Sequence, residues 1–285
     1  MGKFSERGIS PPDEYGRSVA DRFSGRVAIN VPKGDHPRLA TLLKAVNQDD
    51  DLYALWVASN VNAVDRLGMT DHGPVHVKIV MNLGLRLLRL FLDRDIEPSV
   101  VTNYGMESED GEIVVAMAAL MHDLGMAIHR QDHESFSLFL AKEKLDQLLP
   151  LVYDARTSAI VRSEILHAII GHRSGGRPLT LEAGIVRIAD ALDMAKGRSR
   201  IPVEAGSVSI HSVSAAAIES VSLEPGEERP VRIVIRINNS AGMFQLDQVF
   251  RDKLQGSGIE GYVELEAVLH DPAEGEARLF KGFRL

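Results

Sequence analysis

Residues with helical apolar spacing follow one another almost without a break from about residue 74 to about residue 195, and this pattern constrains the fold more than any other feature of the chain. The segments 74–92, 113–124, 134–149 and 158–171 each have the length and periodicity of one helix with a buried face. A stretch of this length without strand patterning predicts a bundle of packed helices.

The ends of these segments carry residues that favour helix boundaries. Pro74 suits a first helical turn, Ser108 and the two acidic residues after it suit a helix start, and Pro150 closes a helix. Thr180 can cap a further helix, on which four apolar residues recur at helical spacing: Leu181, Ile185, Ile188 and Leu192.

The regions on either side of the bundle have a different character. Residues 1–24 form a polar arm, Arg26–Val31 alternate like a short strand, and Pro37–Val46 and Leu52–Leu67 have helical spacing. After Gly197 the sequence predicts one helix at about 243–255 and strands at 207–211, 218–223, 231–237, 261–269 and 277–284.

These patterns predict a mainly α fold with a smaller α+β unit at its C-terminal end. We divide the chain into an N-terminal arm with a short strand and a helix (1–49), a helical domain (50–200) and an α+β domain (201–285). No recognisable site lies in the last of these.

Composition excludes several classes of protein. The 285 residues are 45% apolar and 25% charged, which is typical of a globular protein. The formal net charge of −8 disfavours nucleic acid or an anionic membrane as the main partner. The chain has no cysteine, so any metal must be bound through nitrogen and oxygen atoms. Neither a signal peptide nor a membrane-spanning run is visible, so we expect a cytoplasmic protein with no membrane partner.

Seven of the ten histidines lie between residues 72 and 172. The most informative is His122, because Met121-His122-Asp123-Leu124 places an imidazole and a carboxylate at the end of an apolar helix. Burying both groups is costly unless something pairs them, and a divalent cation would do so. Asp190 repeats this situation in the apolar run IVRIADALD. Pairing of each carboxylate with a neighbouring histidine or arginine is the alternative.

The order His…His-Asp…Asp, with each part on a different expected helix, resembles the HD (His-Asp) superfamily of metal-dependent phosphohydrolases over about residues 50–200. His72 and His76 compete for the first position. Family members typically have a small or branched apolar pair one turn after this ligand, and Val80-Met81 fits His76 better. The resemblance therefore implies a first metal bound by His76, His122, Asp123 and Asp190.

The segment HRSGGRPLTLEAGIVRIAD is similar to a stretch of HD-type dinucleoside-tetraphosphate hydrolases, in which a histidine precedes the final aspartate by 18 residues. His172 stands at that position here. These two-metal relatives have another histidine on the helix after the His-Asp pair, to which His133 corresponds best, with His129 as a weaker competitor. His167 is interpreted as a packed or capping residue. The implied ligands are His76, His122, Asp123, His133, His172 and Asp190, with Asp123 bridging.

The remaining expected roles are proton donation to the leaving group, orientation of the attacking water and binding of phosphoryl oxygens. His72-Gly-Pro-Val-His76 is similar to a motif of cyclic-nucleotide phosphodiesterases in which the first histidine protonates the leaving oxygen; a solvent-facing His72 is the alternative. Asp123 is the second residue expected to take part in catalysis, and either Asp123 or Asp190 is expected to orient the attacking hydroxide. Phosphoryl oxygens are expected to bind to cationic side chains that follow two of the implied ligands in the sequence: Arg173, Arg177, Lys196 and Arg198. For Lys196 a solvated helix end is the alternative.

One departure from the family is visible. A lysine often follows the His-Asp pair by three residues, whereas this chain has Met126 there.

The resemblance implies hydrolysis of a phosphate ester or anhydride, with a nucleotide or related small molecule as substrate. The expected cofactors are two divalent metal ions, of Mn, Fe, Co, Ni, Zn or Mg. A di-iron oxygenase and a regulatory module that binds metal without turnover are alternatives, and a nuclease is disfavoured by the charge. The C-terminal unit is compatible with a role in a homodimer or in closing the site.

Overall fold

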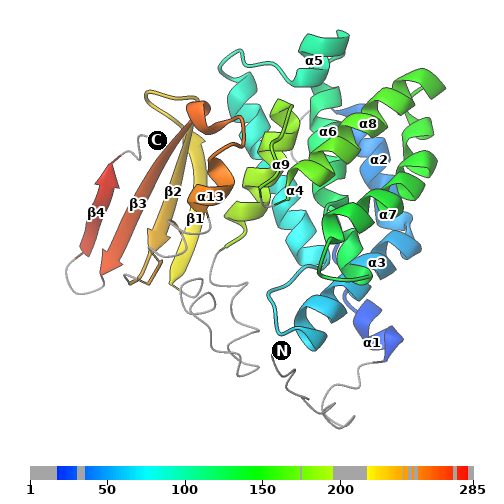
Figure 1. Cartoon of the computed structure of the whole chain (residues 1–285), viewed down its shortest axis with the longest axis horizontal. Helices are drawn as coiled ribbons and strands as arrows, with labels where there is room; N and C mark the ends of the chain where they lie inside the picture. Colours follow the sequence, from blue (N-terminus) through cyan, green and yellow to red (C-terminus); the bar gives the residue numbers. More distant parts are fainter. Residues whose placement is uncertain are drawn as a thin grey trace, which may run out of the picture.

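The computed structural model describes residues 18–30, 36–173, 175–194, 217–239, 241–242, 246, 250–271 and 275–281. A helical body makes up most of it, and a sheet lies along one side of that body (Figure 1). The predicted fold class, a helical bundle with a smaller C-terminal α+β part, is confirmed.

Helix α6 (Ser108–Met121) lies at the centre of the helical body. Every residue from Asp110 to Met121 is buried, which explains why its sequence is apolar on all sides. Helices α4 (Pro74–Leu92) and α9 (Leu181–Leu192) pack beside it. Gly84 allows this close approach, because a Cβ atom there would lie 2.8 Å from Val115 Cγ1.

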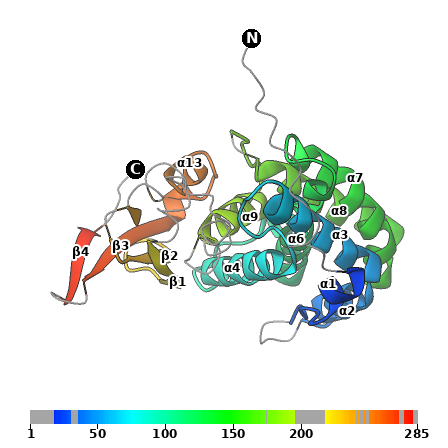
Figure 2. The ribbon, with the colours of Figure 1, turned by 90° about the horizontal axis from the view of Figure 1, so that it is seen from below.

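The remaining helices surround this centre (Figure 2). Helix α3 continues into a short π-helix at Val61–Arg66, and 3₁₀ turns lie at Leu124–Ala127 and Leu149–Leu151. The surrounding helices are α1 (Val19–Phe23), α2 (Pro37–Gln48), α3 (Asp50–Asn60), α5 (Ser99–Tyr104), α7 (His133–Leu148) and α8 (Ala155–Gly171).

The sheet has the strand order β1-β2-β3-β4. Its outer pairs are antiparallel, whereas the central pair β2–β3 is parallel. A parallel pair needs a crossover connection, and this one carries the short helix α13 (Arg251–Leu254), which lies against α9. A 3₁₀ turn, Glu260–Tyr262, precedes β3. The strands are β1 (Ile218–Pro225), β2 (Val231–Ile237), β3 (Val263–Asp271) and β4 (Gly275–Lys281).

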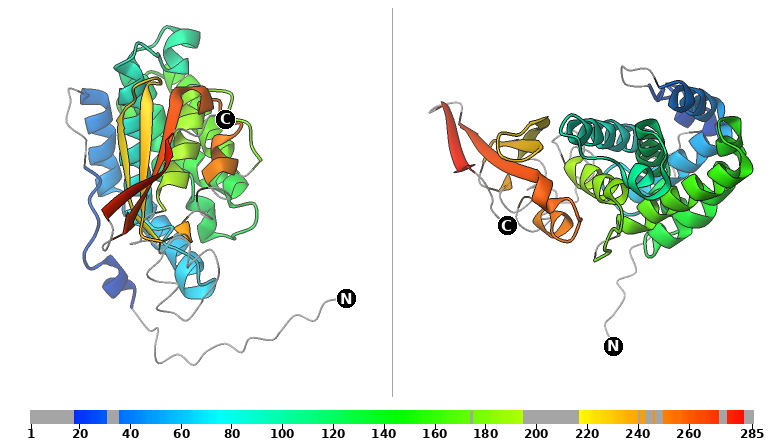
Figure 3. Two further views of the ribbon diagram at one scale, coloured as in Figure 1. Left: turned by 90° about the vertical axis from the view of Figure 1, so that its left-hand side faces the viewer. Right: turned by 90° about the horizontal axis from the view of Figure 1, so that it is seen from above.

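The sheet packs against α4, so its apolar residues join the core of the helical body (Figure 3). Leu39 and Leu43 of α2 also belong to this core, as do Ile233 and Ile235 of β2. The boundaries at residues 49 and 200 stay predictions. No helix among the described residues is both long and apolar enough to cross a bilayer.

One prediction for the N-terminal region is wrong. Residues 26–30 form no strand, because the Asn47 side chain satisfies the backbone of Ile29 in place of a partner strand: Ile29 N donates to Asn47 Oδ1 (2.8 Å), and Asn47 Nδ2 donates to Ile29 O (2.7 Å). The polar arm contains helix α1, whose first turn is capped by Ser18. Residues 1–17 and the strand expected at 207–211 lie outside the described residues.

Candidate metal centre

The helix ends bring six side chains with nitrogen or oxygen donors to one place in the bundle. His76 lies in the first turn of α4, His133 is the first residue of α7, and Asp190 lies in the last turn of α9. His122 and Asp123 follow the last residue of α6, and His172 follows the last residue of α8. These are the six ligands that the family resemblance implies, and all but Asp190 are buried.

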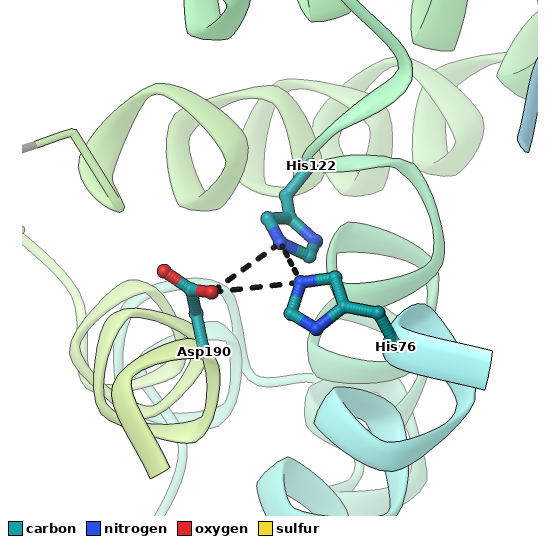
Figure 4. Close-up of side chains that lie close together, drawn as sticks. All are labelled: His76, His122 and Asp190. Carbon is teal, nitrogen blue, oxygen red and sulfur yellow. Dashed lines mark hydrogen bonds and ion pairs between the residues drawn. The ribbon is translucent and has the colours of Figure 1, made fainter. Parts of the chain in front are cut away.

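The six side chains form two groups. In the first group, donor atoms of His76, His122 and Asp190 lie close together (Figure 4). His76 Nε2 lies 3.2 Å from His122 Nε2 and 3.6 Å from Asp190 Oδ1, and His122 Nε2 lies 3.8 Å from the same carboxylate oxygen. Asp123 Oδ2 lies 3.3 Å from both Nε2 atoms. Four donors therefore face a common centre.

These distances fit a metal ion. Ligands about 2.1 Å from a tetrahedral ion lie about 3.4 Å from one another, and the five distances above run from 3.2 to 3.8 Å. Two neutral imidazoles cannot form a hydrogen bond through two unprotonated Nε2 atoms. A proton or a cation between His76 and His122 removes that conflict.

The second group uses the other oxygen of Asp123. His133 Nε2 lies 3.2 Å from Asp123 Oδ1, and His172 Nε2 lies 3.8 Å from it. Glu134 also has a carboxylate oxygen within 4.8 Å of donor atoms of both histidines. Asp123 thus presents one oxygen to each group, which is the arrangement expected of a bridging carboxylate.

The Nδ1 atoms of these histidines face acceptors on the protein. Nδ1 donates to Ala119 O in His122 (2.8 Å) and to Ile169 O in His172 (2.5 Å). His76 Nδ1 lies 2.6 Å from Asp193 Oδ2. Such partners fix the ring and its tautomer, leaving Nε2 as the ligand atom, as in many protein metal sites.

The surroundings of His133 are more mixed. Its Nδ1 lies 3.0 Å from the carbonyl oxygen of Arg130 and 3.2 Å from Glu134 Oε2, while the Arg130 guanidinium lies 2.9 Å away. Two acceptors therefore favour the Nδ1–H tautomer, and the guanidinium opposes it.

The charges of the cluster also call for a cation. Burial opposes ionisation of both Asp123 and Asp190, but His122 beside the first and Lys253 and His122 beside the second hold the pKa of each carboxyl well below its usual range. Burial lowers the pKa of His122 less than the two carboxylates raise it, so this pKa reaches about 10. Without a metal, a proton on His122 balances part of the negative charge. A divalent cation would do so more fully.

Gly125 brings helix α7 close to the His-Asp pair. A Cβ atom at Gly125 would overlap the His133 carbonyl oxygen and lie 2.6 Å from Ser137 N. Ser137 then connects the two segments, because its Oγ donates to His122 O (2.6 Å) and accepts from Gly125 N (2.8 Å). Gly125, two residues after Asp123, thus lets α7 come close enough to place His133 beside Asp123.

The other predicted residues lie in different surroundings. His72 is buried next to the cluster, with its ring centroid 5.6 Å from that of His76 and its Nδ1 2.7 Å from Thr70 O. His129 is exposed and lies outside the groups of candidate ligands found among the described residues. His167 Nε2 accepts from Leu179 N (3.0 Å), which agrees with its interpretation as a capping residue.

The predicted phosphate-binding cations divide into two sets. Arg173 is half exposed and lies 3.4 Å from Asp132, and Arg177 is exposed in the same loop. Lys196 and Arg198 lie outside the described residues.

Three residues beside the cluster were not identified from the sequence. Asp193 and Glu134 each follow a predicted ligand closely, and this proximity of a second carboxylate was the available signal. Lys253 Nζ lies 3.3 Å from Asp190 Oδ2, although 63 positions separate the two residues. No local pattern could have indicated that contact.

Comparison with known proteins agrees with this geometry. A family model described as HD domain matches residues 76–195, a span that begins at His76 and includes all six candidate ligands. The chain is also 41% identical over 209 residues to the protein of Methanocaldococcus jannaschii called Uncharacterized protein MJ1020; the aligned part covers 73% of this chain and 81% of that protein.

Proposed function

Because the chain belongs to the HD domain family, we propose that it is a metal-dependent phosphohydrolase that cleaves a phosphate ester or anhydride of a nucleotide or a related small molecule. The observation that carries this proposal is the position of Asp123. One of its oxygens faces His76 and His122, and the other faces His133 and His172. A bridging carboxylate between two sets of imidazoles is suited to a pair of divalent cations.

Two ions would divide the six side chains between them. His76, His122 and Asp190 would hold the first, His133 and His172 would hold the second, and Asp123 would take part in both sites. When bound, such cations act as Lewis acids that polarise a phosphoryl group and make a water molecule more acidic. The protein supplies the rigid donors, since backbone carbonyls and Asp193 fix the imidazoles.

Two residues of the chain act on protons and water in this proposal. Asp123 orients the attacking water from its place between the two groups of histidines. His72 protonates the leaving oxygen, and its ring stands beside that of His76 with Nδ1 held by the Thr70 carbonyl. Neutral His72 carries its proton on Nδ1. When Nε2 takes up a second proton, the imidazolium becomes the general acid that donates this proton to the leaving oxygen.

The proposal is tested with metal-depleted protein that is reloaded with one metal at a time. Nucleoside mono-, di- and triphosphates, dinucleoside polyphosphates and cyclic nucleotides form the substrate panel, and released phosphate or nucleotide is measured. We expect hydrolysis that requires added metal and is absent in Asp123→Ala. The control Asp146→Ala removes an exposed carboxylate that contacts Lys142 and should retain full activity.

An oxygenase is the second candidate, because four imidazoles and two carboxylates also suit iron. Oxygen consumption by the iron-loaded protein, without hydrolysis of any substrate in the panel, would favour it. Stoichiometric metal binding without either activity would favour a binding or regulatory module.

A further inference from the structure

Lys253 connects the C-terminal part of the chain to the metal centre. It lies on α13, well beyond the span 76–195 that matches the HD family model. Its Nζ donates to the His172 carbonyl (2.8 Å) and lies 3.3 Å from Asp190 Oδ2. The ammonium group therefore reaches the two helix ends that supply one candidate ligand to each metal.

Buried Arg187 holds Lys253 in this position. Arg187 Nε donates to Lys253 O (2.8 Å) and Nη2 donates to Asp252 O (3.2 Å). Its Nη1 donates to Arg173 O (2.7 Å) and Gly176 O (2.8 Å), in the loop after His172. One guanidinium on α9 thus fixes both that loop and the backbone of α13, which lies next to α9 (Figure 2).

The charges around Lys253 indicate what it binds. Its side chain is 20% exposed and that of Asp190 is 17% exposed, whereas the four histidines and Asp123 are almost fully buried. The pair therefore lies at the more accessible side of the cluster. Two divalent cations would repel this ammonium group, and the carboxylates of Asp123 and Asp190 together offset only half of their charge, so a further anion is favoured there. A phosphoryl group has the charge and the acceptor oxygens to serve as this anion.

We propose that Lys253 is a substrate-binding residue of the metal centre, contributed by the C-terminal α+β part, and that its ammonium group binds the phosphoryl oxygens of the substrate. This inference rests on the proposed function and specifies how an anionic substrate is held. It also gives the C-terminal part a direct role in the site. Arg173 is less suited to this role, because it is 51% exposed and faces Asp132.

The test measures binding of inorganic phosphate to the metal-loaded protein by titration calorimetry, with metal content determined on the same samples. In Lys253→Met we expect unchanged metal content and phosphate affinity lower by about 10–100-fold, as expected for loss of one charged hydrogen bond. Lys253→Arg should retain affinity within a few-fold. Lys142→Met removes an exposed lysine paired with Asp146 and should behave as wild type.

The outcomes separate this inference from the proposed function. If Lys253→Met loses metal, the lysine positions Asp190 and the inference is overturned. Unchanged phosphate affinity with full metal content also overturns it. For any substrate that the wild type hydrolyses, KM should rise with the phosphate dissociation constant. Phosphate binding that depends on Lys253, in a protein that hydrolyses nothing, supports the inference and contradicts the proposed function.

Discussion

At the level of single residues, the proposed second metal depends on His172. His172 Nε2 faces Asp123 Oδ1, and burial, together with the positive charges of His122 and Lys253, lowers its pKa to about 3. The imidazole is therefore neutral at pH 7 and ready to bind a cation. We expect His172→Ala to bind about half as much metal as the wild type, measured by elemental analysis after dialysis. His129→Ala is the matched control, and unchanged stoichiometry in His172→Ala would reduce the centre to one metal.

His72 gives a prediction about the leaving group. His72→Ala should retain both metals but lose about 10²–10⁴-fold in kcat on substrates with poor alkoxide leaving groups, the range for loss of a general acid. On p-nitrophenyl esters, whose leaving group needs no proton, the loss should nearly vanish. Equal losses on both kinds of substrate, or loss of metal, would show that His72 is a ligand. In the structure His76 faces Asp123 and Asp190, as expected of the ligand.

At the level of elements, the position of α7 depends on Gly125. In Gly125→Ala the new methyl group would overlap the His133 carbonyl, so α7 has to move and carry His133 away from Asp123. We expect a loss of about 1–3 kcal/mol in the free energy of unfolding, and weaker binding of the second metal. Urea unfolding and metal analysis measure both effects. Gly261→Ala is the control, since nothing lies within 4 Å of its Cβ position.

Arg38 joins the start of α2 to the start of α6 through Glu109. Arg38 N and Nε donate to the two carboxylate oxygens of Glu109, each at 2.9 Å. Burial raises the pKa of Glu109, but these hydrogen bonds outweigh it and lower the pKa below its ordinary value of 4.5. The ionised form is therefore favoured in the folded state, so the stabilisation is present above about pH 4.5 and is lost as the pH falls below it.

Glu109→Gln tests this contact between helices. Above pH 5 the variant should be less stable than the wild type by about 1–2 kcal/mol, because the Arg38 guanidinium then faces a neutral amide instead of a carboxylate. Below about pH 4 the difference should shrink, since the unfolded wild type then takes up a proton on Glu109 and the stabilisation from the charged form is progressively lost. Unfolding free energies at pH 7 and pH 3.5 give the comparison. A difference that stays constant across this range would show that the carboxylate charge contributes nothing.

The helix boundaries and the candidate ligands were predictable because their signals are local. Pro74 begins α4, and Thr180 Oγ1 accepts from Ala183 N at the start of α9, as capping residues do. The candidate ligands were assigned from the order of histidines and aspartates along the chain and from the family that this order resembles. The contact of Lys253 with Asp190 depends instead on the crossover between β2 and β3, which no short pattern specifies. The strand expected at Arg26–Val31 failed for the same reason, because alternation does not supply a partner strand.

The whole molecule should respond to metal, because the candidate ligands come from α4, α9 and the ends of α6, α7 and α8. A cation that binds the folded state alone stabilises it by mass action, by about 2.7 kcal/mol at a free concentration of 100 times Kd. For a protein of this size that corresponds to a rise of about 5–10 °C in Tm. Without metal, the positive charges of His122 and Lys253 are what balance the negative charges of Asp123 and Asp190.

We therefore expect chelation to lower the Tm measured by differential scanning calorimetry, and re-addition of metal to restore it. Asp123→Ala should show no such dependence, because it lacks the oxygens that face both groups of histidines. His172→Ala should keep part of the effect, since the first group is intact. If chelation leaves the Tm of the wild type unchanged while metal analysis shows that the metal is gone, the buried histidines and carboxylates are held together by protons alone. The cluster would then be a structural core of the bundle.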